Sequence, residues 1–147
     1  MPEKATLRRV DKDRREGKAP STQAGEFVRE EIEHVREGKH GARSSRQAIA
    51  IGLSKARRAG VDLPPPRKGA TSRRTRRQAV RDARAGSRPV STRRSRATLR
   101  ALTREGRAAG SRDALSRQSR KAVARRSKQS RSVAARRAAT TRKREGR

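Results

Sequence analysis

Arginine clusters are the residues in this chain that are best suited to chemistry, and the chemistry they suit is phosphate binding. Of the 147 residues, 44 are Lys or Arg and 14 are Asp or Glu, which gives a formal charge of +30. A guanidinium group can bridge two phosphate oxygens, whereas an ammonium group cannot. The candidate nucleic-acid-binding residues are Arg73, Arg74, Arg76, Arg77, Arg93, Arg94, Arg96, Arg120, Lys121, Arg125, Arg126, Arg136, Arg137, Arg142, Lys143 and Arg144.

Residues suited to other chemistry are sparse. There is no cysteine, so neither a thiolate nucleophile nor a zinc–cysteine site can form. No phosphate-cradling glycine loop and no catalytic dyad is recognisable. We therefore expect no enzymatic activity, no cofactor and no bound metal. Two histidines, His34 and His40, lie near the acidic run Glu30, Glu31, Glu33 and Glu37. We interpret this run as the exposed face of a helix, which in the absence of DNA could also hold the basic tail.

The charge divides the chain just before the triple proline that begins at Pro64. Residues 1–63 carry 15 basic and 10 acidic side chains, whereas residues 64–147 carry 29 and 4. Eleven of the 18 Leu, Ile, Val and Phe residues lie in the first part, so a packed core must form there. The predicted fold is mostly α-helical where ordered. It consists of a basic segment with a weak helix (1–18), a helical hairpin module (19–63) and a long disordered cationic tail (64–147).

The first helix of the hairpin is predicted over 21–37. The large apolar residues Phe27, Val28, Ile32 and Val35 repeat with helical spacing, so they form one face and belong to the predicted core. Ser21 or Thr22 is expected to cap the start, and Gly38 is expected to end the helix.

The second helix is predicted over 45–59. Ser44 and Gln47 have the spacing of a capping box, and Gly60 suits a left-handed helix end. Ile49 and Leu53 are its core residues. The alternation of Ile49, Ile51 and Leu53 also fits a strand, but two alanines, the helix caps and the lack of a second strand candidate favour a helix.

Ile51 lies about 200° around this helix from Ile49, so a single partner helix cannot cover both side chains. The hairpin also offers few large apolar residues for its length, and it is expected to be unstable alone. We expect Ile51 to pack against a second copy of the module in a homodimer, or against the N-terminal segment near Leu7 and Val10.

The stretch SRQAIAIGLSKAR, with its flanking residues over about 15–66, resembles an uncharacterised family of small basic bacterial proteins. Members of this family share an SxxQAIAIxLSxARxAG core. The Arg- and Ala-rich tail also resembles the tails of linker-histone-like bacterial proteins. The resemblance implies a bacterial source and a compact helical core, but it implies no activity and no site residues.

The nucleic acid that fits best is duplex DNA. The chain has no Tyr or Trp, and its one Phe is expected in the core, so the aromatic platforms that stack on single-stranded bases are missing. A sequence-reading helix-turn-helix is disfavoured because Ile49, Ile51 and Leu53 occupy the middle of the helix that would enter the groove. Backbone binding, with little dependence on base sequence, is therefore predicted.

The predicted function is that of a nucleoid-associated or DNA-protecting protein. One alternative is an RNA-binding or ribosome-associated protein, because a basic tail binds any phosphate backbone. Another is a stress-related module that binds a protein and uses the tail as an anchor. No secretory signal and no apolar run of membrane-spanning length is recognisable, so we expect no membrane contact and a cytoplasmic, nucleoid location.

Overall fold

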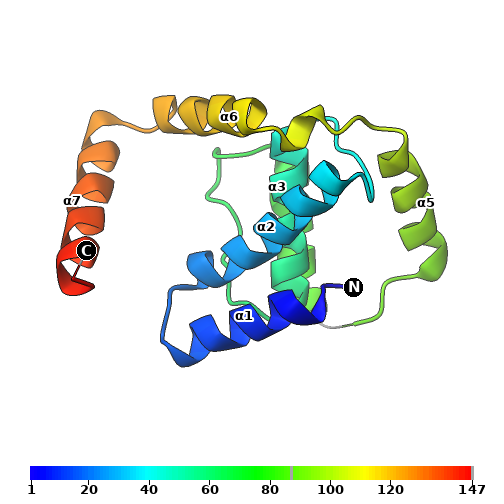
Figure 1. Ribbon diagram of the computed structural model, residues 1–147, viewed down its shortest axis with the longest axis horizontal. Helices are drawn as coiled ribbons and strands as arrows, with labels where there is room; N and C mark the ends of the chain where they lie inside the picture. Colours follow the sequence, from blue (N-terminus) through cyan, green and yellow to red (C-terminus); the bar gives the residue numbers. More distant parts are fainter. Residues whose placement is uncertain (87, 147) are drawn as a thin grey trace. The chain divides into compact units, whose positions relative to one another are not determined.

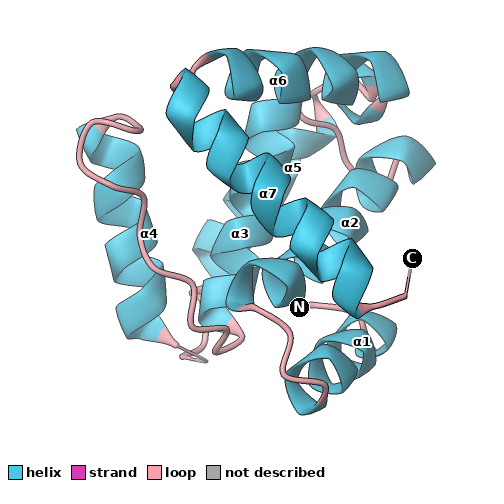
Figure 2. Ribbon diagram, turned by 90° about the vertical axis from the view of Figure 1, so that its left-hand side faces the viewer, coloured by secondary structure: helices cyan, strands magenta, loops and turns pink. Residues whose placement is uncertain are grey.

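The computed structural model describes residues 1–86 and 88–146, and its regular elements are all helices (Figures 1 and 2). The described ranges contain no strand, so the helical interpretation of the Ile49–Leu53 alternation is confirmed. None of the described helices is both long enough and apolar enough to cross a membrane. The elements are α1 (Lys4–Arg15), α2 (Pro20–Glu37), α3 (Ser45–Arg58), α4 (Arg73–Ala85), α5 (Thr92–Thr103), the 3-10 helix η1 (Ala108–Gly110), α6 (Arg112–Ala124) and α7 (Lys128–Arg144).

The chain forms two compact units, Met1–Ser111 and Arg112–Arg147. The first contains α1 to α5 and η1, and the second contains α6 and α7. The division of the sequence at residue 64 is one of charge. As a division into domains it stays a prediction.

Both helices of the predicted hairpin are present, and the signals at three of their four ends are confirmed. Ser44 Oγ accepts a hydrogen bond from Gln47 N at 3.2 Å, which is the predicted cap of α3. Gly38 ends α2 in the left-handed region with φ of 77°, and Gly60 follows α3 with φ of 87°. These torsion angles favour glycine because it has no Cβ to clash with the following carbonyl.

The start of α2 differs from the prediction. The N-cap residue is Ala19, which has no capping side chain, and Pro20 is the first residue of the helix. Proline is favoured there because its φ is already helical and its missing N–H is not needed in the first turn. Ser21 and Thr22 therefore lie inside the helix, and their prediction as caps is wrong.

Small residues, which the predicted core did not include, form much of the contact between α2 and α3. Phe27, Val35 and Ile32 are buried as predicted. Val28, Ile49 and Leu53 are only half-buried. The buried residues of α3 at four-residue intervals are Ala48, Gly52 and Ala56. A stripe of small side chains lets the two helix backbones approach closely, so the isoleucine and leucine flank the contact and do not fill it.

Helix α1 completes one side of this core. Val10 is buried with Ala24, Phe27, Ala56 and Val61, and Leu53 and Leu63 pack against this cluster. Val10 thus packs against the module, but the predicted contact was that of Ile51 with Leu7 and Val10. Ile51 does not belong to this cluster and remains half-exposed. The predicted homodimer stays a prediction.

The predicted disorder of the tail is not what the structure shows, because its described residues form four α-helices and η1. The physical reason lies in the local signals. Alanine and arginine both favour helix, and Ser72 and Ser127 cap α4 and α7 by accepting hydrogen bonds from the backbone N–H three residues later. These caps and propensities offset the repulsion between neighbouring arginines, which opposes helix formation.

One part of the tail also packs against the hairpin. Gly41 N donates a hydrogen bond to Leu102 O at 2.9 Å, and Ser45 Oγ donates one to Ala109 O at 2.6 Å. Arg36 Nε donates to Gly110 O at 2.7 Å. Leu102, Ala109 and Gly110 are buried. Residues 102–110 therefore cover part of the surface of the hairpin.

Candidate nucleic-acid interface

Helix α4 places four arginines along its outer side. It is held on α3 by the buried carboxylate of Asp82, which accepts hydrogen bonds from Ser54 Oγ at 2.7 Å and Gln78 Nε2 at 2.9 Å. Arg58 NH1 lies 3.9 Å from the same carboxylate, and Arg58 NH2 donates to Arg88 O at 2.7 Å. Since Asp82 faces α3, the opposite side of α4 faces solvent.

The exposed side of α4 is a continuous arginine stripe. Arg73, Arg77, Arg81 and Arg84 follow one another at helical spacing, and all four are exposed. Arg74 and Arg76 flank the stripe, and Arg76 Nε donates a hydrogen bond to Pro66 O at 3.2 Å. A row of cations on one face of a helix concentrates positive potential there, which attracts a polyanion such as a nucleic-acid backbone.

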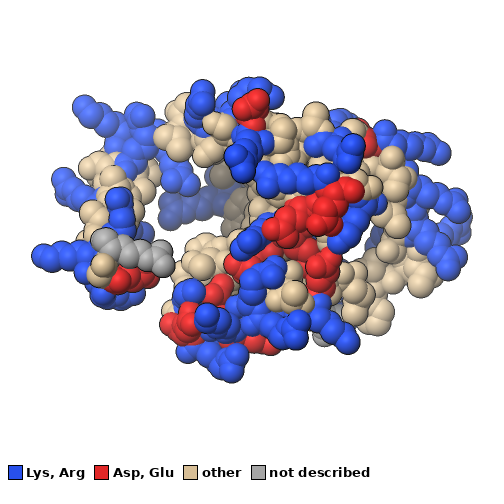
Figure 3. All heavy atoms as spheres, in the orientation of Figure 1, with Lys and Arg blue, Asp and Glu red and all other residues tan. Residues whose placement is uncertain are grey.

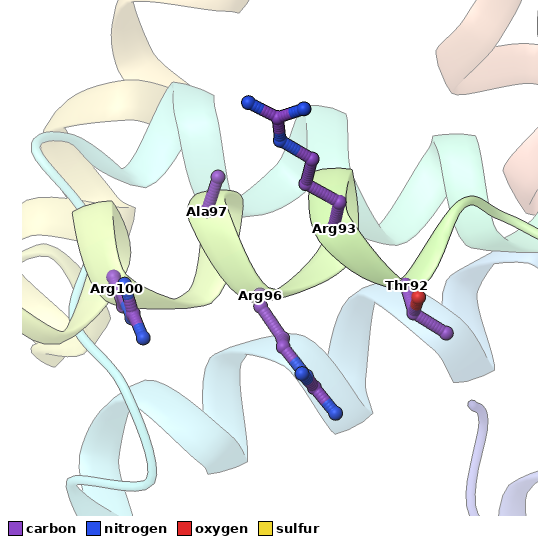
Figure 4. Close-up of a pocket in the computed structure, with 5 residues that line it drawn as sticks. All are labelled: Thr92, Arg93, Arg96, Ala97 and Arg100. Atoms are coloured by element: carbon purple, nitrogen blue, oxygen red, sulfur yellow. The ribbon is translucent and has the colours of Figure 1, made fainter.

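Helix α5 carries arginines on two sides (Figure 4). The side chains of Arg96, Arg100 and Thr92 point to one side of the helix, and Arg93 points to the other. These residues, together with Ala97, line a shallow hollow of about 360 Å³. A single helix forms its walls, so the hollow offers little enclosure to a small molecule and suits an extended anionic chain better.

The second unit carries the remaining predicted binding residues. Arg120 and Lys121 lie on α6, and Arg125 and Arg126 lie between α6 and α7. The other five, all on α7, are Arg136, Arg137, Arg142, Lys143 and Arg144. Neither helix has a buried residue.

Some basic side chains of the described residues form ion pairs with carboxylates, and the predicted binding residues do not. Every Lys, Arg or His that lies within 4.0 Å of a carboxylate comes from residues 1–63. All sixteen predicted binding residues are exposed, and among the described residues none of them forms such a pair. Their charges are therefore available to an external anion.

Replacing Asp82 by Ala is expected to release α4 from α3. The change leaves Ser54 Oγ without its acceptor and removes the carboxylate beside the half-buried Arg58, at a cost of about 1–3 kcal/mol. Amide hydrogen exchange should then be faster throughout α4 and little changed in α2. Asp113→Ala, at an exposed position in the first turn of α6, is the matched control. Unchanged exchange in α4 of the Asp82 variant would contradict this anchoring role.

Acidic residues form a second polar feature, which the sequence interpretation misplaced. On the face drawn in Figure 3, acidic side chains form a band along α2, with basic side chains around it. Glu33 and Glu37 lie toward solvent, but Glu30 is 2% exposed and Glu31 is 1% exposed. The interpretation of these two as exposed is wrong. The signal was in the sequence, because Glu31 follows Phe27 and precedes Val35 by four residues each.

Lys55 of α3 forms ion pairs with both buried glutamates. Its Nζ lies 2.6 Å from Glu31 Oε2 and 3.7 Å from Glu30 Oε1. Nearby, hydrogen bonds from His34 and Lys39 lower the pKa of Glu3 to about 2, so Glu3 is charged at neutral pH. The ion pairs of the described residues therefore involve basic side chains of the hairpin and the N-terminal segment, whereas the predicted binding residues on α4 to α7 form none there.

A small, strongly basic helical protein is thus the class that the fold and the charges define. Residues 4–68 match a family of unknown function, DUF6496. This match covers the helices of the hairpin and α1, but it reaches neither α4 nor the other helices of the tail. It agrees with the resemblance of SRQAIAIGLSKAR to an uncharacterised family. No curated protein and no solved structure matches the chain.

Proposed function

We propose that this protein binds duplex DNA through its phosphate backbone, with little dependence on base sequence, as a nucleoid-associated or DNA-protecting protein without enzymatic activity. The observation that carries the proposal is the set of sixteen exposed cations without a carboxylate partner among the described residues. Counterions condensed on DNA are released when such cations replace them, and this release drives binding.

Duplex DNA is proposed over single-stranded RNA because the binding helices offer no aromatic ring for base stacking. Phe27 is the only Phe, Tyr or Trp in the chain, and it is fully buried. The arginine stripe of α4 contacts a phosphate backbone in this proposal. In this proposal the α2–α3 pair does not read bases, because residues 102–110 pack against the connection between the two helices and against the first turn of α3.

Competition between duplex DNA and a structured RNA of equal charge tests the choice of polymer. A labelled DNA duplex bound to the full chain is titrated with each unlabelled competitor, and anisotropy is recorded. Unlabelled DNA should compete at lower concentration. If RNA competes better, the protein is an RNA-binding protein. If neither polymer binds, and a protein partner stays bound to the chain after nuclease treatment, the helical module binds that protein and the tail serves only as its anchor.

We expect a steep salt dependence for this binding. If about ten cations contact phosphates, log affinity should fall against log salt concentration with a slope near −9. Anisotropy titrations at several NaCl concentrations give the slope. A slope shallower than about −3 would mean that few phosphates are contacted, and backbone binding would then not be the main source of affinity.

A further inference from the structure

A cluster of one glutamate and two histidines lies beside the buried acidic residues of α2. One ligand atom from each of Glu31, His34 and His40 can be chosen so that all three lie within 4.8 Å of one another. Glu31 and His34 are three residues apart on α2, and His40 lies in the connection to α3. Residues three apart project from the same side of a helix, and the tight end of α2 at Gly38 brings His40 back toward them.

The buried carboxylate of Glu31 lacks well-directed partners. Its Oε2 lies 2.6 Å from Lys55 Nζ, and its Oε1 lies 3.2 Å from His40 Nε2. Neither contact has the directions of a hydrogen bond, so both oxygens are buried without a hydrogen-bond donor. A buried carboxylate in this state is costly unless a cation satisfies it. The ammonium group of Lys55 lies nearest Oε2, which leaves Oε1 facing His40.

The orientation of His40 also favours a cation at this position. Its Nδ1 lies 3.0 Å from Gly41 O. A carbonyl oxygen only accepts, so Nδ1 carries the proton, and in the neutral ring Nε2 then presents a lone pair toward Glu31 Oε1. Two acceptors 3.2 Å apart need a positive centre that contacts both, and a metal ion about 2 Å from each atom would lie to one side of the line that joins them. A backbone carbonyl that holds the other ring nitrogen is also the usual support of a metal-binding histidine.

His34 also contacts an oxygen acceptor, and it would therefore bind a metal through its other ring nitrogen, Nδ1. Its Nε2 lies 2.8 Å from Glu3 Oε1, and Lys39 Nζ lies 2.9 Å from the same oxygen. The rings of His34 and His40 meet edge to face with their centres 5.9 Å apart. Both imidazoles are thus oriented by an oxygen acceptor. A hollow of about 330 Å³, lined in part by Glu37, His40 and Glu105, brings solvent to His40; Glu31 and His34 are not among its lining residues.

We propose that Glu31, His34 and His40 bind a divalent transition-metal ion of the zinc class. Imidazole nitrogen with one carboxylate oxygen suits such an ion better than Mg²⁺ or Ca²⁺, which prefer oxygen ligands alone. Ligand atoms around tetrahedral zinc lie roughly 3.4 Å apart, so the pair at 3.2 Å already fits and His34 closes in on binding. The ion links α2 to its connection with α3, and the basic helices take no part.

The test is a titration of the full chain with ZnCl₂ in a phosphate-free buffer, followed by calorimetry and by NMR of the imidazole signals. His34 and His40 are the only histidines. We expect one zinc per chain, a change in both sets of imidazole signals, and a melting temperature that rises with zinc concentration. MgCl₂ should produce none of these. No heat and unchanged imidazole signals with excess zinc would overturn the proposal, and His40 and Glu31 would then be a simple ion pair.

Variants identify the ligands. His34→Ala and His40→Ala should each weaken zinc binding by at least about tenfold. Glu33→Gln removes a neighbouring carboxylate on the solvent side of α2, where Arg29 pairs with it, and should leave zinc binding unchanged. Equal zinc binding by the histidine variants would place the ion elsewhere and overturn the proposal. If a variant fails to fold, the wild-type imidazole signals still decide the outcome.

Discussion

Replacing Arg73, Arg77, Arg81 and Arg84 together by glutamine should weaken binding to duplex DNA by up to about a thousandfold at physiological salt. The reason is that the four side chains form the exposed stripe of α4. Each phosphate contact that is lost should also reduce the salt slope by about 0.9. Glutamine favours helix nearly as well as arginine, so α4 should persist in circular dichroism. Anisotropy titrations with a duplex at several salt concentrations measure both changes.

The matched control removes the same number of charges from α1. Lys4, Arg8, Arg14 and Arg15 are exposed, and none of them pairs with a carboxylate among the described residues. Their replacement by glutamine should weaken binding by less than about tenfold, through the general field of the protein alone. Equal losses in the two variants would mean that α4 is no interface and that only total charge matters.

Replacing Gly52 by Ala is the second change with a large expected effect. A Cβ at this position would lie 2.6 Å from Val28 Cα and 2.9 Å from Val28 N. Both are backbone atoms, so α2 and α3 must move apart. We expect a net loss of about 2–4 kcal/mol in the free energy of unfolding, although alanine favours helix by about 1 kcal/mol. The melting temperature should fall by roughly 5–15 °C in a thermal scan followed by circular dichroism.

Gly25→Ala provides the comparison for this variant. Gly25 also lies inside a helix, but a Cβ there would meet nothing within 4 Å. The same gain in helix propensity should then appear alone, so the melting temperature should stay unchanged or rise. A Gly52 variant as stable as the Gly25 variant would show that the close crossing of α2 and α3 does not limit stability.

The local structure of the hairpin could be predicted because its signals are local. Ser44 with Gln47, and Gly38, act within one helical turn, so the sequence contains all the information they need. The core was only partly predictable. Size alone suggests Ile49 and Leu53, whereas the close crossing selects the small residues Ala48, Gly52 and Ala56, and this choice depends on the partner helix.

The tail and the acidic cluster show where composition misleads. Net charge and few large apolar residues predicted disorder, yet Leu102 and Ala109 find a surface on residues far away in the sequence. Likewise, a run of glutamates suggests an exposed face. Glu31 is buried nevertheless, because its position relative to Phe27 and Val35 places it on the apolar side of α2, where Lys55 compensates its charge. Long-range partners of this kind cannot be deduced from charge counts.

Because residues 102–110 pack on the hairpin, the stretch between Pro64 and Leu102 can vary in length. Gly41, in contrast, cannot accept even one added methyl group. Arg57 holds Leu63 O and Pro64 O at one end of the intervening stretch, and Gly41 holds Leu102 O at the other. Doubling the length of such a closed loop costs only about 0.6 kcal/mol of chain entropy. A Cβ on Gly41, in contrast, would lie 1.9 Å from Glu105 O. Insertions between α4 and α5 can therefore extend the reach of the α5 arginines, while α4 stays held on α3 and the closure at Gly41 stays the same.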